Sequence, residues 1–126
     1  MKNPKKSLIL SVLLIGAVLA LLCTACAGAD EEKDKEYTVK YEVTGPATVA
    51  NSLTYENATG GHDQKNNVNI PWSYTFNVSG KNIGLHLFTN FGVSNENTYT
   101  TNIYVNGKLE KSSSGIGYVS VSHFIY

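Results

Sequence analysis

Hydrophobic and polar residues alternate with a period of two along most of the chain after residue 36. In the run YTVKYEVTG, residues 37–45, tyrosine and valine occupy one face, threonine, lysine and glutamate occupy the other, and Gly45-Pro46 ends the run. This period, together with frequent β-branched and aromatic residues, predicts β-strands. No stretch here combines a capping residue with a helical period, so we expect no helix in this part of the chain.

Further runs of the same kind predict the remaining strands and their connections. Asn106-Gly107 lies between two alternating runs and is the strongest hairpin signal, because both residues accept the positive φ of a type I′ turn. Pro71 has no N–H to donate and is expected at a strand break, an edge or a bulge. The last run is apolar on both faces, as in a central strand. The expected strands are 48–55, 68–78, 82–91, 98–105, 108–112 and 116–126, with turn-rich segments at 56–67 and 92–98.

Two stripes of large apolar residues are expected to face a core. The first stripe consists of Val49, Leu53 and Tyr55 and is interrupted by Asn51. The second consists of Trp72, Tyr74, Phe76 and Val78. About eight short strands with turns every eight to twelve positions predict an all-β fold, either an antiparallel sandwich or a small barrel.

The N-terminal part of the chain has a different pattern. Three lysines fall within the first six residues, and no charged residue occurs from Ser7 through Ala29. A basic start, the apolar run 8–22 and small residues after it are typical of a secretory signal. The uncharged window of 23 residues is also long enough for a retained transmembrane anchor. Its strictly hydrophobic part has only 15 residues, which is short for a stable span.

Two cysteines at the end of the apolar run separate these alternatives. A redox Cys-x-x-Cys needs a βαβ context, and a structural zinc site needs further ligands, yet Cys23 and Cys26 are the only cysteines in the sequence. The run LCTAC resembles the bacterial lipoprotein signal, in which small residues precede a cysteine that is diacylated and becomes the new amino terminus. Ala25 precedes Cys26 as in that signal, whereas Cys23 stands where the pattern usually has leucine. The resemblance implies a signal peptide at 1–25 and lipidation, palmitate included, at Cys26.

Residues 26–36 are expected to form a flexible tether. The stretch AGADEEKDKE carries five acids and two lysines without an aromatic or branched aliphatic residue, so it has little surface to bury. Residues 37–126 hold five lysines and five acids. This balance favours neither nucleic-acid binding nor attraction to anionic lipid.

Candidate chemistry in the domain is sparse. His62, His86 and His123 are not spaced to meet on one element, and zinc needs three or four ligands. Serines 112–114 and Ser120 precede His123 without a nucleophile turn, and a carboxylate pair of Glu56 and Asp63 has no sign of a cleft. We therefore expect no enzyme, no metal site and no cofactor. The tyrosines and Trp72 either fill the core, which the alternation favours, or line a glycan- or lipid-binding surface.

Three stretches carry a resemblance to a known family: YEVTGPATVANSLTYENATGG (41–61), IPWSYTF (70–76) and IYVNGKLEKSSSGIGYVSVS (103–122). They are similar to the extracytoplasmic domain of the mycobacterial membrane protein small (MmpS) family of transport accessory proteins. The resemblance implies an immunoglobulin-like antiparallel β-sandwich of about seven to eight strands without enzymatic chemistry. Mycobacterial members have a membrane anchor and accompany resistance-nodulation-division transporters that export lipids or siderophores. This chain differs in offering Cys26 where they have a transmembrane helix.

These observations predict a lipoprotein with an MmpS-like domain at 37–126, held on the extracytoplasmic face of the cell membrane or outer membrane by lipid on Cys26. The expected function is non-catalytic interaction with a membrane partner, such as a transporter. Two alternatives stay open: a lipoprotein that binds a small molecule, glycan or lipid, and the same domain on a retained transmembrane anchor.

Overall fold

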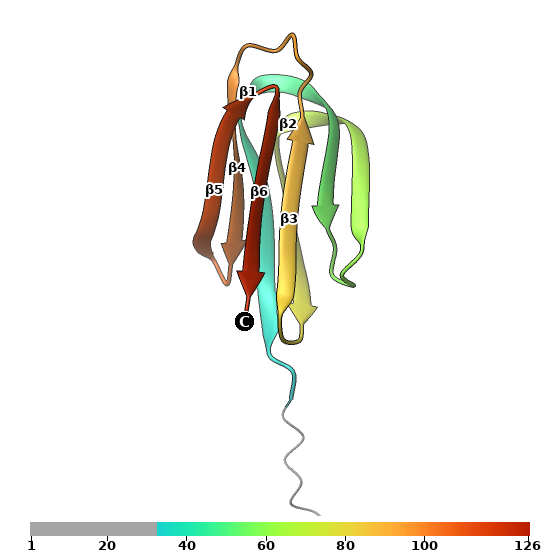
Figure 1. Cartoon of the computed structure of the whole chain (residues 1–126), viewed down its shortest axis with the longest axis vertical. Helices are drawn as coiled ribbons and strands as arrows, with labels where there is room; N and C mark the ends of the chain where they lie inside the picture. The colour runs from blue at the N-terminus through green and yellow to red at the C-terminus, as the bar shows by residue number, and fades with distance from the viewer. Residues whose placement is uncertain (1–32) are drawn as a thin grey trace, which may run out of the picture. The chain divides into compact units, whose positions relative to one another are not determined.

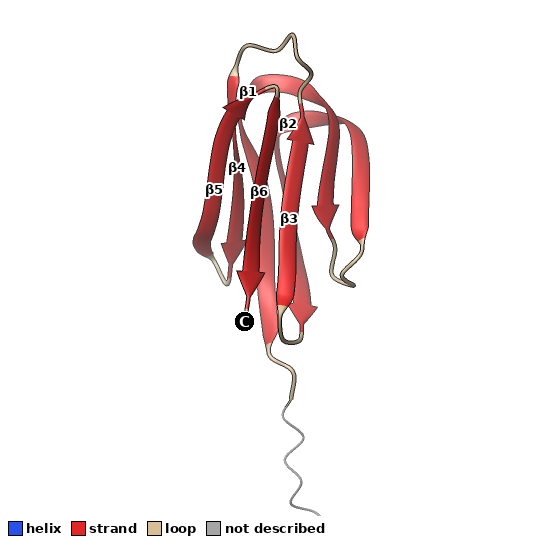
Figure 2. Ribbon diagram, viewed as in Figure 1, coloured by secondary structure: helices blue, strands red, loops and turns tan. Residues whose placement is uncertain are grey.

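The computed structural model describes residues 33–126, and residues 34–126 form one compact unit. Every regular element in this part is a β-strand (Figure 2). Six strands follow one another along the chain: β1 (Glu36–Glu56), β2 (His62–Ser79), β3 (Ile83–Asn90), β4 (Thr98–Val105), β5 (Lys108–Ile116) and β6 (Tyr118–Ile125). The predictions of an all-β fold and of an antiparallel arrangement are confirmed.

Strand β1 is long because it continues through Gly45-Pro46, where the sequence predicted an end. Val43 pairs with Trp72 and Thr48 pairs with Ile70, so residues 44–47 of β1 lie opposite Pro71 alone. This bulge bends the strand without ending it. The predicted strands 37–45 and 48–55 are therefore two halves of one element, and β2 likewise runs through Pro71, which gives six strands instead of seven to eight.

The two halves of β1 have different neighbours. Residues Val39–Thr44 pair with β4, residues Ser52–Tyr55 pair with β3, and β2 pairs with both halves on the other side. The strand order is β5-β4-β1-β3-β6, with β2 attached to β1. The sheet curls until β5 and β6 approach each other (Figure 1), which nearly closes a barrel. The described part is thus one bent antiparallel sheet, and the separate layers of the predicted sandwich are not confirmed.

The core lies inside this curled sheet. Tyr37, Val39, Tyr41 and Val43 face inward as the alternation predicted, and the last three are fully buried. Tyr41 packs against Phe76 at 5.3 Å between ring centroids. Burying a side chain of this size stabilises a fold by roughly 1.5–3 kcal/mol. The remaining buried apolar residues are Ala50, Leu53, Tyr55, Val68, Ile70, Val78, Leu85, Leu87, Phe91, Tyr99, Ile103, Val105, Val119, Val121 and Ile125.

Three local predictions were wrong. Val49 was expected to face the core. The bulge changes which residues of β1 point inward, so that Ala50 is buried and Val49 is exposed. Residues 62–67 were expected in a loop, but they pair with β1 and start β2, even though their side chains are exposed. The last run was expected to be a central strand, but β6 pairs with β3 and stands last in the strand order of the described part.

Two opposite ends of the domain matter for function. The tether end consists of the start of β1, the turn after β2, the Asn106-Gly107 turn and the end of β6 (Figure 1). Both turn residues have positive φ, 51° for Asn106 and 79° for Gly107, as the hairpin prediction required. The distal end consists of the bend of β1, the loop 91–97 and the turn at Gly117 (Figure 1). The Phe91 N–H donates to the Gly117 carbonyl at 2.7 Å and ties that loop to that turn.

Candidate docking surface

The predicted lipidation site, Cys26, lies outside the described residues, as do the predicted signal peptide 1–25 and most of the tether. The described chain begins at Lys33, and β1 begins at Glu36. In residues 33–126 the structure contains no helix of the length and hydrophobicity needed to cross a membrane.

The distal end carries four exposed apolar side chains. Val93 lies in the loop after β3 and is 85% exposed. Val49 follows the bend of β1, and Ile116 and Tyr118 flank the turn at Gly117. We name these four residues the distal rim. Apolar side chains gathered at one end of a domain and left in water are typical of an interaction site.

A shallow hollow adjoins the distal rim. It is lined by Val49, Phe91 and the polar residues 94–97 of the loop. Phe91 stacks on Tyr99 with ring centroids 3.7 Å apart, so the floor of the hollow is rigid. Asn95 accepts a hydrogen bond from the Asn97 N–H at 3.1 Å and donates one to the Tyr99 hydroxyl at 3.1 Å, which holds the loop in place.

Strand β2 offers a second exposed feature. Among the described residues it pairs with β1 alone, so its other side is an unpaired edge, and Pro71 lies in this edge strand opposite the bulge of β1. Trp72 and Tyr74 are half-buried on this strand. The Trp72 ring lies 5.7 Å and the Tyr74 ring 5.2 Å from the Tyr55 ring between centroids. The edge is thus backed by stacked aromatic residues and could accept an extended segment.

A polar network on the outer face joins β1 to β4. The Glu42 carboxylate contacts the Lys40 ammonium at 2.7 Å and accepts hydrogen bonds from the Asn102 amide at 3.2 Å and the Tyr104 hydroxyl at 3.0 Å. The hydrogen bond from Lys40, with smaller contributions from Asn102 and Tyr104, lowers the pKa of Glu42 against the opposing effect of partial burial. The same hydrogen bond raises the pKa of Lys40. The polar groups of these side chains are thus paired with one another, and the hydrogen bonds that Glu42 accepts from Asn102 and Tyr104 help to hold β1 and β4 in register.

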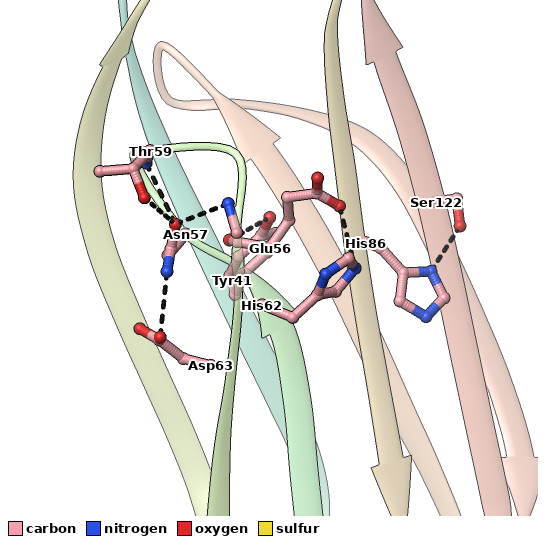
Figure 3. Close-up of polar contacts among 9 residues, drawn as sticks. Tyr41, Glu56, Asn57, Thr59, His62, Asp63, His86 and Ser122 are labelled. Atoms are coloured by element: carbon pink, nitrogen blue, oxygen red, sulfur yellow. Dashed lines mark hydrogen bonds and ion pairs between the residues drawn. The ribbon is translucent and has the colours of Figure 1, made fainter.

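The three histidines have separate surroundings, and Figure 3 shows two of them, His62 and His86. His62 pairs with Glu56 at 3.5 Å, and His86 hydrogen-bonds Ser122 at 2.8 Å through Nδ1. His123 lies near the tether end beside Lys111. Within residues 33–126 no three His, Cys, Asp or Glu side chains are grouped so that they could hold a metal ion.

The other candidate catalytic groups also have separate partners. Ser114 bonds Thr100 at 2.7 Å across β4 and β5. Asp63 accepts a hydrogen bond from Asn57 at 3.0 Å, while Glu56 contacts His62 (Figure 3). The Asn57 side chain also accepts hydrogen bonds from Thr59 and from the Gly61 N–H, so it shapes the turn between β1 and β2. These contacts are those of a structured turn, and they bring no nucleophile and base together.

The aromatic residues outside β2 and the Glu42 network lie mostly in the core or in two pairs on the outer face. Four tyrosines are buried, and burial raises the pKa of Tyr41 above its usual value. On the outer face of β3 and β6, Phe88 stacks with Tyr118 at 6.2 Å, whereas Phe124 packs against Tyr126 at 5.0 Å. Tyr118 starts β6 and Phe124 lies near its end, so the pairs stand at opposite ends of the strand. A single continuous aromatic surface does not form on this face.

Comparison with known proteins decides the family. The family model described as Mycobacterium membrane protein matches residues 9–120. The chain belongs to the Mycobacterium membrane protein family. The match includes both the apolar N-terminal run and nearly all of the β domain, and it confirms the resemblance to the MmpS family found in the sequence. No curated protein matches the chain.

Membership in the Mycobacterium membrane protein family makes the protein membrane-associated. Sequence reasoning missed the distal rim, because its four residues come from three separate segments that only the fold brings to one end. One signal was present: Val93 stands next to Gly92 in the turn-rich segment 92–98, outside any alternating run that would bury it.

Proposed function

We propose that the protein is a lipid-anchored, extracytoplasmic, non-catalytic interaction domain that serves a membrane transporter of the resistance-nodulation-division type. The observation that carries the proposal is the family match over residues 9–120. The cysteine-containing end of the apolar run supports diacylation of Cys26 as the anchor. The two differently paired halves of β1 support an immunoglobulin-like arrangement as the finer description of the fold.

The distal rim supports docking to a protein. It lies at the end of the domain opposite the tether, where a partner that projects from the membrane would meet it (Figure 1). The ten tether residues after Cys26, 27–36, reach at most about 35 Å. Confinement within that distance raises the local concentration of the domain near a partner in the same membrane, so a small apolar surface suffices for binding.

Capture of a small molecule, glycan or lipid is the second candidate function. The observation in its favour is an apolar hollow beside β6, lined by Leu85, His123, Phe124 and Tyr126 among others. On the outer face of β3 and β6 the aromatic residues form two separate pairs, so an extended aromatic capture surface does not form beside this hollow, which favours docking.

Site-specific photo-crosslinking in the native envelope distinguishes the two functions. A photoreactive residue at Ile116 should give an adduct with a large membrane protein, while the same residue at Ser112, exposed on the same strand, should give little. Equal adducts from both positions would contradict docking at the distal rim. Recovery of bound small molecules without a protein adduct would favour capture.

A further inference from the structure

The tether end carries an apolar surface of its own, separate from the distal rim. Phe124 and Tyr126 are exposed at the end of β6, Leu109 is exposed on β5 beside the Asn106-Gly107 turn, and Tyr126 is 89% exposed. The Phe124 ring packs over Gly84, where an added Cβ would lie 3.7 Å from the ring. It also contacts the Tyr126 ring at 5.0 Å between centroids. The Phe124 ring therefore lies on the outer surface of β6 with Tyr126 beside it, while Val121 and Ile125 of the same strand are buried in the core.

Lysine side chains lie near these rings, and the hollow beside the rings holds two lysines and one acid. Lys35 and Lys108 line one hollow together with Phe124, Tyr126 and Glu110, and Lys108 contacts Glu110 at 3.2 Å. Long lysine stems lie along apolar surface and keep the ammonium in water. Aromatic residues beside such lysines are the side chains that occupy the boundary between a bilayer and water. Because Glu110 offsets one of the two lysines, contact with a bilayer would rest mainly on the apolar groups, with a small contribution from positive charge.

The chain leading to the apolar N-terminal run leaves the domain at this same end. The Lys35 carbonyl accepts a hydrogen bond from the Gly80 N–H at 3.1 Å, and the Thr38 carbonyl accepts one from the Asn106 N–H at 2.8 Å. The Asn106 side chain also accepts a bond from the Thr38 N–H at 2.9 Å. These hydrogen bonds hold the start of β1 between the turn at Gly80 and the turn at Asn106, so the chain enters the domain at a fixed position.

The membrane is within reach of this end under either kind of anchor. If lipid on Cys26 is the anchor, residues 27–35 span at most about 32 Å. If the uncharged window 7–29 is instead retained in the bilayer, residues 30–35 span at most about 21 Å. The same end of the domain is confined near the lipid surface in both cases.

We propose that the tether end rests on the lipid bilayer, with Leu109, Phe124 and Tyr126 inserted at its interface. The proposal depends on the membrane anchoring proposed above and is independent of which anchor is used. A weak contact suffices, because the anchor makes it intramolecular. The contact orients the domain so that the distal rim points away from the membrane, toward the extracytoplasmic part of a partner.

Fluorescence quenching by brominated lipids tests this contact directly. Residues 26–126 contain the whole compact unit 34–126 and a single cysteine, Cys26. The protein is attached through the Cys26 thiol to a maleimide lipid in vesicles of phosphatidylethanolamine and phosphatidylglycerol with brominated chains. Tyr126→Trp reports on the tether end and Tyr118→Trp, at the other end of β6, is the matched control. The unsubstituted protein supplies the background from Trp72.

We expect the tryptophan at position 126 to be quenched at least about twofold more strongly than that at position 118, as for an aromatic residue in the interfacial belt. High salt should leave most of the quenching in place, because insertion rests mainly on apolar groups and only one of the two lysines in this hollow is not offset by an acid. Equal quenching at the two positions, or quenching lost at high salt, would overturn the proposed insertion. Chemical attachment bypasses cellular acylation, so a failure of Cys26 lipidation in cells would refute the anchor without altering this result.

Discussion

Individual side chains on the outer face contribute through pairing rather than burial, and Glu42 is the clearest case. Its carboxylate contacts Lys40 and accepts hydrogen bonds from Asn102 and Tyr104. The lowered pKa means that the folded state holds the ionised form more strongly than the unfolded state does. This stabilisation is present above the unfolded pKa, about 4.3, and is lost as pH falls through the lower folded pKa.

We expect Glu42→Gln to lower the free energy of unfolding by about 1 kcal/mol at neutral pH, because charged hydrogen bonds are replaced by neutral ones. The variant should also lose less stability than the unsubstituted protein as the pH falls below about 4.3. Urea unfolding at neutral and acidic pH measures both effects. Glu96→Gln, in the exposed loop after β3, is the control, and equal behaviour of the two variants would contradict the role given to Glu42.

Thr89 shows the opposite situation in the core. It is fully buried, and its hydroxyl has no hydrogen-bond partner among the described residues. Thr101 is equally buried, but its hydroxyl donates to the Ser113 carbonyl at 3.3 Å. An unpaired buried hydroxyl costs stability that a methyl group of the same shape does not.

Thr89→Val should therefore raise the free energy of unfolding by about 1 kcal/mol. Thr101→Val, which removes a hydrogen bond, should leave it unchanged or lower it. Thermal or urea unfolding of the two variants gives the comparison. A lower free energy of unfolding in Thr89→Val than in the unsubstituted protein would show that the hydroxyl of Thr89 is paired in solution.

At the scale of elements, the bend of β1 organises the whole sheet, since it gives one strand two sets of neighbours. Gly45 at the bend has φ 144°, and an added Cβ would lie 2.6 Å from the Tyr99 ring. Gly80 has a similar φ, 135°, but an added Cβ there would meet nothing within 4 Å. The two glycines differ in their surroundings far more than in backbone conformation.

We expect Gly45→Ala to destabilise the fold by roughly 2–3 kcal/mol, from backbone strain and a clash with a buried ring. Gly80→Ala should cost roughly 1 kcal/mol, from backbone strain alone. The difference between the two unfolding free energies isolates the contact with Tyr99. Equal destabilisation of the two variants would contradict the close packing of Gly45 against the Tyr99 ring.

The strands themselves were largely predictable from the sequence, but their boundaries and neighbours were not. Alternation identified the inward residues of 37–43, and Asn106-Gly107 identified the hairpin, because both signals are local. The continuation of β1 through Gly45-Pro46 was missed, since that dipeptide is equally compatible with a turn and a bulge. The pairing of residues 62–67 was missed because their side chains are all exposed and leave no hydrophobic pattern.

At the scale of the whole molecule, the surfaces proposed to bind a partner and the bilayer stand at opposite ends of one domain. Neither end was predictable from the sequence, because each combines residues from segments far apart in the chain. Val49 and Tyr118 of the distal rim come from different strands, and so do Leu109 and Phe124 at the tether end. What the sequence did indicate was the family, through motifs spread along the chain, and the family match confirms it.

The central claim is that this family domain is held at the membrane by lipid on Cys26. Mass spectrometry of the protein extracted from the membrane fraction tests it most directly. We predict a mature chain that begins at Cys26 and carries a diacylglyceryl group, both in the unsubstituted protein and in the Cys23→Ser control. A membrane-bound protein that still begins at Met1, with Cys26 unmodified, would contradict the claim.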